Sequence, residues 1–89
     1  MPEITLTVYN KVGLHARPAA LFVQAAKQFN CDVKVTHGER EGNAKSILSV
    51  LALGVDQGAV ITIRAEGEGA DQALAALEVL IEDNFGEKE

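Results

Sequence analysis

The strand-like stretches of this chain alternate apolar and polar residues, and this alternation limits the possible folds more than any other feature. Ile4, Leu6 and Val8 alternate with threonines, and a second alternating stretch begins at Val33 and a third at Ile61. A period of two is typical of a strand with one buried face. Strands that are apolar on one face only favour a largely antiparallel sheet that is covered on one side.

Between these strands the apolar residues recur every three to four positions, which predicts helices over 16 to about 28 and 70 to about 83. A shorter helix is predicted over 47–53, with Ser46 as its N-cap and Gly54 just beyond its end. The residues predicted to be buried are Ala19, Phe22, Val23 and Ala26 in the first helix, Val50 and Leu53 in the second, and Ala73, Leu74, Leu77, Leu80 and Ile81 in the third.

The glycines and charged residues from Gly38 to Gly42 predict a hairpin turn and a short, weak strand. His37, at the start of that turn, is predicted to be structural or solvated, and Cys31 a small buried residue. The tail 84–89 is predicted to be polar and frayed. The element order is then βαββαβα. It predicts an α/β (α+β) open-faced sandwich, with a four-stranded, largely antiparallel sheet covered on one face by three helices.

Length and composition indicate one globular domain over residues 1–89. Hydrophobic residues make up 47% of the chain and charged residues 24%, which is ordinary for a folded domain. The single cysteine excludes an intramolecular disulfide and favours a reducing compartment. No secretory signal or membrane-length apolar run is visible, so we expect a cytoplasmic protein without membrane insertion.

The net charge of −5 is unevenly distributed along the chain. Residues 1–65 carry seven basic and five acidic side chains, whereas 66–89 carry one basic and eight acidic ones. This balance and the scarcity of aromatic residues oppose nucleic acid as a partner. A neutral-to-basic face that holds Arg17, Lys27 and Lys45 is instead suited to acidic protein surfaces.

The segment GLHARPA at 13–19 carries the most specific chemistry of the chain. It places His15 immediately before a helix, Arg17 two positions later and Pro18 in the first turn, where its missing amide is tolerated. Free backbone amides and the positive end of the helix dipole make such a position an anion site that favours the neutral imidazole. The pattern predicts a histidine that accepts and donates phosphoryl groups; taken alone, it also fits a surface histidine at a helix start.

The extended segment GLHARPAA closely resembles the active-site signature of the HPr family, the histidine-containing phosphocarriers of the sugar phosphotransferase system. NAKSIL at 43–48 resembles the second signature of that family, and Leu53-Gly54 followed by Gly58-Ala59 resembles its later turn pattern. The likeness covers essentially the whole chain. HPr proteins have an open-faced α/β sandwich, in agreement with the fold predicted from the alternation.

The resemblance implies a carrier that is itself phosphorylated rather than a stand-alone enzyme. His15 would accept the phosphoryl group on Nδ1 from enzyme I, which phosphoenolpyruvate charges, and donate it to sugar-specific permease components. Arg17 would be the electrostatic partner, and the amides of Ala16 and Arg17 would cradle the phosphate. The partners supply the remaining groups and the metal, so we expect no cofactor and no metal ligand in this chain, and a monomer.

Two surfaces are candidates for partner docking. Ala20, Gln24 and Lys27 continue the helix face of Arg17, a pattern that by itself fits an ordinary solvated face but that in the family meets partner proteins. A helix as short as 47–53 cannot bury all its large side chains, so Ile47, Leu48 and Leu51 are expected to form an exposed apolar patch.

An alternative function is a regulatory interaction module that is read through phosphorylation of Ser46. A serine at this position also serves as a plain N-cap without any modification. The resemblance implies, for some organisms, an HPr kinase/phosphorylase and a transcription regulator as further partners. Leu48, Ser49 and Leu51 stand where Gram-positive members often have methionine, glycine and methionine, which weakens the case for recognition by that kinase.

Overall fold

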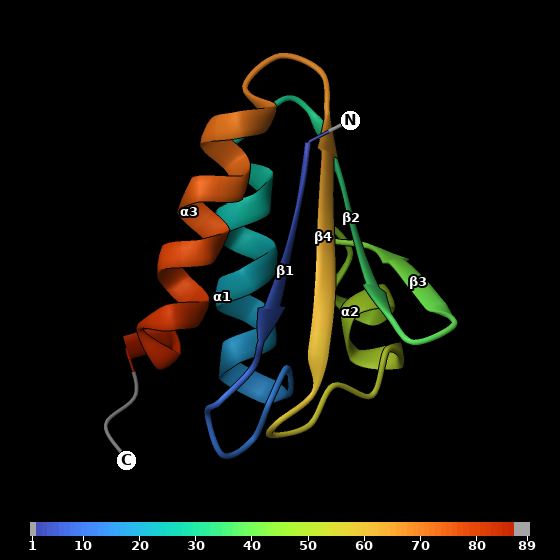
Figure 1. Ribbon diagram of the computed structural model, residues 1–89, viewed down its shortest axis with the longest axis vertical. Helices are drawn as coiled ribbons and strands as arrows, with labels where there is room; N and C mark the ends of the chain where they lie inside the picture. Colours follow the sequence, from blue (N-terminus) through green and yellow to red (C-terminus); the bar gives the residue numbers. More distant parts are fainter. Residues whose placement is uncertain (1, 87–89) are drawn as a thin grey trace.

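The computed structural model describes residues 2–86 of the chain. One antiparallel sheet is covered on one face by helices, and the observed order agrees with the predicted βαββαβα up to a final short turn (Figure 1). The elements are β1 (Glu3–Thr7), α1 (Ala16–Lys27), β2 (Asp32–His37), β3 (Arg40–Asn43), α2 (Ile47–Ala52), β4 (Val60–Glu66), α3 (Ala70–Glu82) and a 3₁₀ turn, η1 (Asn84–Gly86).

The strands lie in the order β1-β4-β2-β3, and every neighbouring pair is antiparallel. In the register of β1 with β4, Thr5 faces Thr62, and the hydroxyls of these two residues are 3.1 Å apart. The open face is polar: Arg64 donates to Glu3 at 3.3 Å, and Lys34 pairs with Glu41 at 3.9 Å. An apolar inner face and a charged outer face are what the alternation of the strands requires, so the predicted open-faced sandwich is confirmed.

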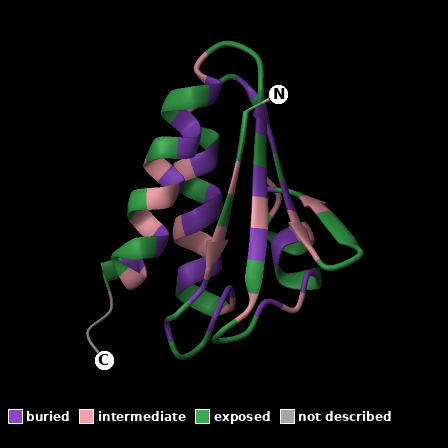
Figure 2. Cartoon of the chain, viewed as in Figure 1, coloured by how far each residue is buried: buried purple, intermediate pink, exposed green. Residues whose placement is uncertain are grey.

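The core lies between the sheet and the helices, as the buried segments in Figure 2 show. The inward residues of β2 and β4 are buried, and so are the predicted inward residues of α1 and α2. In α3, Leu80 is only partly buried, because it lies at the margin of the stripe formed by Ala73, Leu74, Leu77 and Ile81. Cys31 is buried beside β2, as predicted.

The prediction for the C-terminal tail is wrong over residues 84–86. Asn84 and Phe85 both have positive φ values, 52° and 57°, and the turn that they form folds Phe85 back onto the core, where it is 4% exposed. Burial of an aromatic ring offsets the cost of the left-handed backbone. Residues 87–89 of the predicted tail lie outside the described residues. None of the helices within residues 2–86 has the length and apolar character needed to span a membrane.

Two connections, residues 8–15 and 53–59, lie against each other at one end of the sheet (Figure 1). The amide of Val8 donates to Ala59 at 2.9 Å, and the amide of Leu14 donates to the carbonyl of Val55 at 2.9 Å. Gly13 makes the closest approach: a Cβ at this position would lie 2.1 Å from the Val55 oxygen, and φ is +62°. Only glycine fits a left-handed position without room for a side chain.

We therefore expect Gly13→Ala to destabilise the protein more than Gly38→Ala does. Gly38 has nearly the same φ, +61°, but a Cβ there meets nothing within 4 Å. Both substitutions place alanine in the left-handed region at about 1–2 kcal/mol, and Gly13→Ala adds about 1–3 kcal/mol for overpacking against backbone. Urea unfolding of both variants measures the difference. If both variants lose the same free energy of unfolding, the two connections can move apart without loss of stability, and the expectation is contradicted.

Candidate functional site

His15 is the N-cap of α1, with an extended backbone of φ −125° and ψ 157°. Its side chain makes no capping hydrogen bond, so it does not satisfy the first amides of the helix. Pro18, which has no amide, is buried in the first turn. The amides of Ala16 and Arg17 thus lie at a helix end where intrahelical acceptors are missing. The position that the sequence predicts for His15 is confirmed.

The backbone at Ala16 has a φ of +49°, which is unusual for a residue with a Cβ. Such a conformation costs about 1–3 kcal/mol and persists only where the surroundings impose it. On one side Leu14 is fully buried and tied to Val55, and on the other Pro18 and Ala19 are buried. The chain therefore turns sharply between two anchored segments, and His15 lies at the turn.

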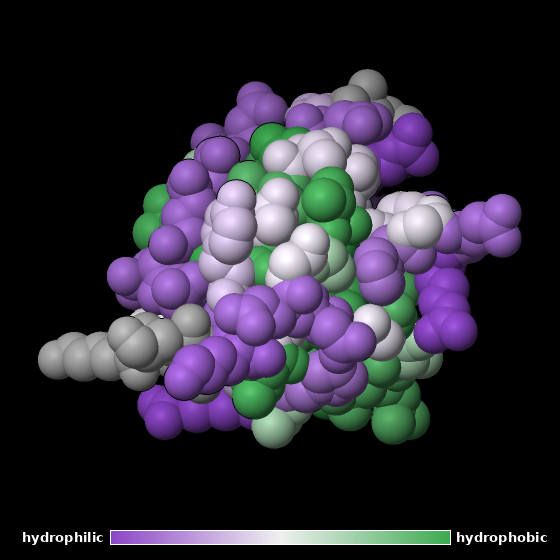
Figure 3. Space-filling model, turned by 60° about the horizontal axis from the view of Figure 1, so that its bottom comes forward, coloured by the Kyte–Doolittle hydropathy of each residue, from purple (hydrophilic) through white to green (hydrophobic). Residues whose placement is uncertain are grey.

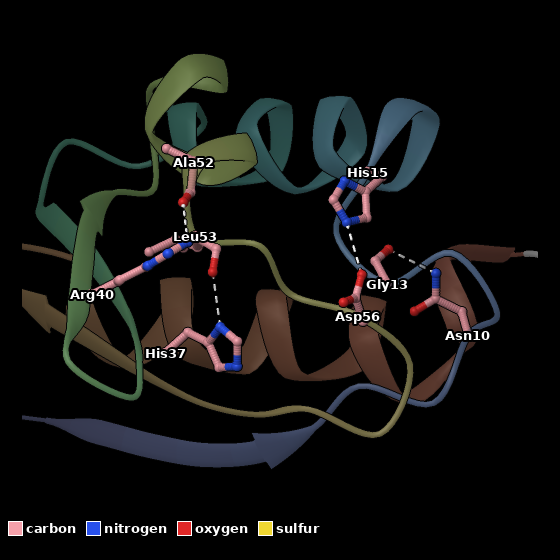
Figure 4. A network of polar contacts seen from close by, with 8 residues as sticks. All are labelled: Asn10, Gly13, His15, His37, Arg40, Ala52, Leu53 and Asp56. Atoms are coloured by element: carbon pink, nitrogen blue, oxygen red, sulfur yellow. Dashed lines mark hydrogen bonds and ion pairs between the residues drawn. The ribbon is translucent and has the colours of Figure 1, made fainter.

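Asp56 is the nearest charged partner of His15. Its Oδ1 is 3.1 Å from Nε2 of the imidazole (Figure 4), and the side chains of His15 and Asp56 are 42% and 82% exposed. An ionised carboxylate can only accept, so Nε2 carries the proton in this contact. In the neutral ring, Nδ1 then keeps its lone pair. Asp56 is not marked by any local pattern in the sequence, and 41 positions separate it from His15, so only the fold brings the two together.

The loop before His15 is held by Asn10, which is 1% exposed. Its Nδ2 donates to the carbonyl of Gly13 at 2.9 Å, and the Gly13 amide donates back to the Asn10 carbonyl at 3.2 Å (Figure 4). These two bonds close a tight turn immediately before Leu14. The turn fixes the path of the backbone that delivers His15.

Arg17 is exposed at the start of α1. Within residues 2–86 no hydrogen bond or ion pair of its guanidinium is present, so the fork of donors is available to a ligand. A guanidinium matches two phosphate oxygens at once. Arg17 and the amides of α1 are therefore the candidate anion-binding groups of the site.

His37 and Arg40 form a separate network at the other end of the region in Figure 4, and the structure does not bring His37 to His15. His37 Nδ1 donates to the carbonyl of Leu53 at 2.8 Å, and Arg40 donates to that of Ala52 at 3.2 Å. Both contacts satisfy carbonyls at the end of α2, where helices lack internal donors. His37 is a structural residue, as predicted.

Lys45 is also tied to the backbone: its Nζ donates to the carbonyl of Phe29 at 2.6 Å, beyond the end of α1. Lys45 is half-buried, whereas Arg17 and Lys27 are exposed. Next to it, Ser46 is the N-cap of α2, and its Oγ accepts from the Ser49 amide at 3.4 Å. The predicted capping role of Ser46 is confirmed.

The two predicted docking surfaces are accessible. Gln24 and Lys27 are exposed on α1, and Ala20 is half-buried beside them. On α2, Leu48 is 77% exposed, while Ile47 and Leu51 are 39% and 37% exposed. Figure 3 shows hydrophobic residues exposed together at the lower right of the view. Among residues 2–86, no three His, Cys, Asp or Glu side chains are grouped as a metal site requires.

An accessible histidine at a helix N-terminus on an open-faced sandwich is typical of small proteins that carry a phosphoryl group. Residues 2–83 match the family described as "PTS HPr component phosphorylation site". The phosphocarrier protein HPr of Xylella fastidiosa is 45% identical over 87 residues, which are 98% of each chain. The chain belongs to the HPr family and is a phosphocarrier of the sugar phosphotransferase system.

Solved structures agree with this assignment. The crystal structure of HPr-C-His from Thermoanaerobacter tengcongensis covers all of both chains at 48% identity, with a TM-score of 0.98. A crystal structure of Crh, the catabolite repression containing protein of Bacillus subtilis, has a TM-score of 0.75 at 39% identity, covers 94% of this chain and 97% of its own, and is described as a swapped dimer.

Proposed function

We propose that His15 is the residue that carries the phosphoryl group, bound through Nδ1. The observation that supports this most directly is the contact of Nε2 with Asp56, because it leaves Nδ1 as the nitrogen with a lone pair. In the transfer, the Nδ1 lone pair forms a bond to phosphorus, and the bond from phosphorus to the donor breaks with its electron pair on the donor. No proton has to leave the ring for this step.

Arg17 and the amides of Ala16 and Arg17 hold the phosphoryl oxygens. The amides lie at the positive end of α1, and the guanidinium is exposed two residues from His15. Charge on the transferring group is spread over its oxygens, so positioned donors lower the barrier without covalent participation.

Enzyme I is the donor in this proposal, and sugar-specific permease components are the acceptors. They dock on Ala20, Gln24 and Lys27 of α1 and on Ile47, Leu48 and Leu51 of α2, since these residues combine accessibility with apolar area. The protein acts in the cytoplasm as a monomer, with residues 1–89 as one domain.

His15→Ala is expected to abolish phosphoryl acceptance and to leave the fold intact, because the side chain is accessible and caps nothing. Incubation with enzyme I and labelled phosphoenolpyruvate tests this: acid-labile, base-stable label appears on the wild type and not on the variant. His37→Gln is the matched control, since its amide can still donate to Leu53 and the site is untouched. Label on His15→Ala equal to the wild type contradicts the proposal.

Arg17→Lys is expected to slow transfer by about tenfold although the charge is retained, because an ammonium cannot bridge two oxygens with a fixed fork. Stability should not change, since Arg17 is exposed. Stopped-flow transfer rates in both directions measure the effect. Arg64→Lys, on the open face of the sheet, is the control and should transfer like the wild type. Unchanged rates for Arg17→Lys would make Arg17 an ordinary solvated residue.

A second proposed role is regulation through phosphorylation of Ser46. Ser46 lies at the start of α2, directly before the exposed Ile47 and Leu48. A phosphate of charge about −1.5 to −2 is locally favourable at a helix start, but its desolvation in an apolar interface is costly. The likeness to Crh, whose name refers to catabolite repression, also favours a regulatory role. An HPr kinase/phosphorylase and a transcription regulator are then further partners.

Ser46→Asp and Ser46→Ala should have opposite effects on thermal stability and on enzyme I binding: each variant loses the property that the other retains. Aspartate is a good N-cap, so Ser46→Asp keeps the thermal stability but weakens enzyme I binding through its charge. Ser46→Ala loses about 1 kcal/mol of capping energy and binds enzyme I normally. Thermal melts and enzyme I titrations of both variants decide between the roles: if Ser46→Asp binds as tightly as the wild type, Ser46 is only a cap.

A further inference from the structure

We propose that Asp56 is a positioning residue for phosphoryl transfer, which holds the His15 ring with its proton on Nε2 and compensates the positive charge that the ring acquires. The inference rests on the proposed role of His15. It adds a residue from the connection between α2 and β4, an element that carries no other part of the site.

The position of Asp56 is set by backbone contacts rather than by its own side chain. The neighbouring Val55 is fully buried and accepts from the Leu14 amide, directly before His15. The Asp56 carbonyl accepts from Ala59 at 3.0 Å, which closes a turn on the other side. Because Gly13 leaves no space between the two connections, the backbone of Asp56 is held at a fixed place beside His15. The Asp56 side chain can then move only by rotation about its own χ angles.

The chemistry of the carrier makes such a carboxylate useful. When Nδ1 bonds to phosphorus, the ring holds a substituent on Nδ1 and a proton on Nε2, and is a cation. The Asp56 carboxylate is 3.1 Å from the Nε2 that carries this proton, so it stabilises the cation in place. On donation, the bond from Nδ1 to phosphorus breaks, its electron pair returns to Nδ1, and the neutral ring keeps the Nε2 proton. A protonated ring is the better leaving group, so Asp56 favours release as well as acceptance.

Two roles of Asp56 predict different behaviour. If the carboxylate served only in docking, its removal would not change the hydrolysis rate of the phosphorylated protein when no partner is present. A carboxylate that keeps the ring protonated changes the reactivity of the phosphorylated protein by itself. The discriminating measurement is therefore the hydrolysis of the isolated phosphoprotein in buffer.

The test uses the full-length wild type, Asp56→Asn, Asp56→Ala and, as the control for net charge, Asp32→Asn on the open sheet face. Each is phosphorylated with enzyme I and labelled phosphoenolpyruvate, and enzyme I is removed before label loss is followed at pH 7.5. Asparagine retains an acceptor for Nε2 without the charge, and alanine retains neither. Both Asp56 variants are expected to lose label about fivefold more slowly than the wild type, an effect of the size of an exposed charge pair. Asp32→Asn should match the wild type.

A second readout follows the tautomer directly. Long-range proton–nitrogen NMR correlations of unphosphorylated protein, recorded where the ring is neutral, report which nitrogen of His15 is protonated. Asp56→Ala is expected to increase the fraction with the proton on Nδ1, and Asp56→Asn to leave it near the wild-type value. Thermal melts of the variants check that the fold is retained.

The outcomes separate this inference from the proposed function. If the wild type takes no label on His15, the proposed function is wrong. If the wild type is labelled on His15 but Asp56→Ala hydrolyses at the wild-type rate, or its tautomer fraction is unchanged, then Asp56 is not a positioning residue while the carrier role stands.

Discussion

The contact between the backbone at Gly13–Leu14 and the backbone at Val55–Asp56 is the constraint on which the site depends. Directly before His15, it holds two connections that are more than forty positions apart against each other, through the bond of 2.9 Å from the Leu14 amide to the Val55 carbonyl and a glycine without room for a Cβ. Because Leu14 and Val55 are both fully buried, this contact belongs to the core and is not a contact between two surface loops. An exposed imidazole is thus positioned by buried residues on both sides of it, which is how a rigid scaffold gives precision to a surface site.

The helix ends are held in a related way, by side chains that come from other elements. His37 and Arg40 bond the last carbonyls of α2, and Lys45 bonds a carbonyl beyond α1. Each contact satisfies a backbone group that the helix itself leaves without a donor. Arg17 and Lys27 are exposed cations at opposite ends of α1, and only Arg17 lies beside His15.

Much of the fold could be predicted because strand alternation, helical spacing and capping residues act locally. Ser46 as an N-cap and Val50 as a core residue follow from spacing alone. The position of His15 could likewise be predicted, since a helix start is a local feature. Asp56 could not, because its role arises from a contact between distant connections. Phe85 escaped prediction for a related reason: its burial depends on a left-handed backbone at Phe85 itself, a bulky residue that rarely adopts one, although Asn84 and Gly86 beside it are of types that do.

The exposure of the site is itself a requirement of a carrier. A group that must be received from one protein and delivered to another cannot lie in a closed pocket, and the proposed carrier residue His15 is accordingly 42% exposed and its carboxylate partner 82%. In such a solvated position each electrostatic contact is weak. Weak contacts hold the phosphoryl group without making its release costly. In the proposed site, the large rate enhancement then comes from complexes in which a partner covers the site, excludes water and strengthens the proposed contacts with Arg17, the α1 amides and Asp56.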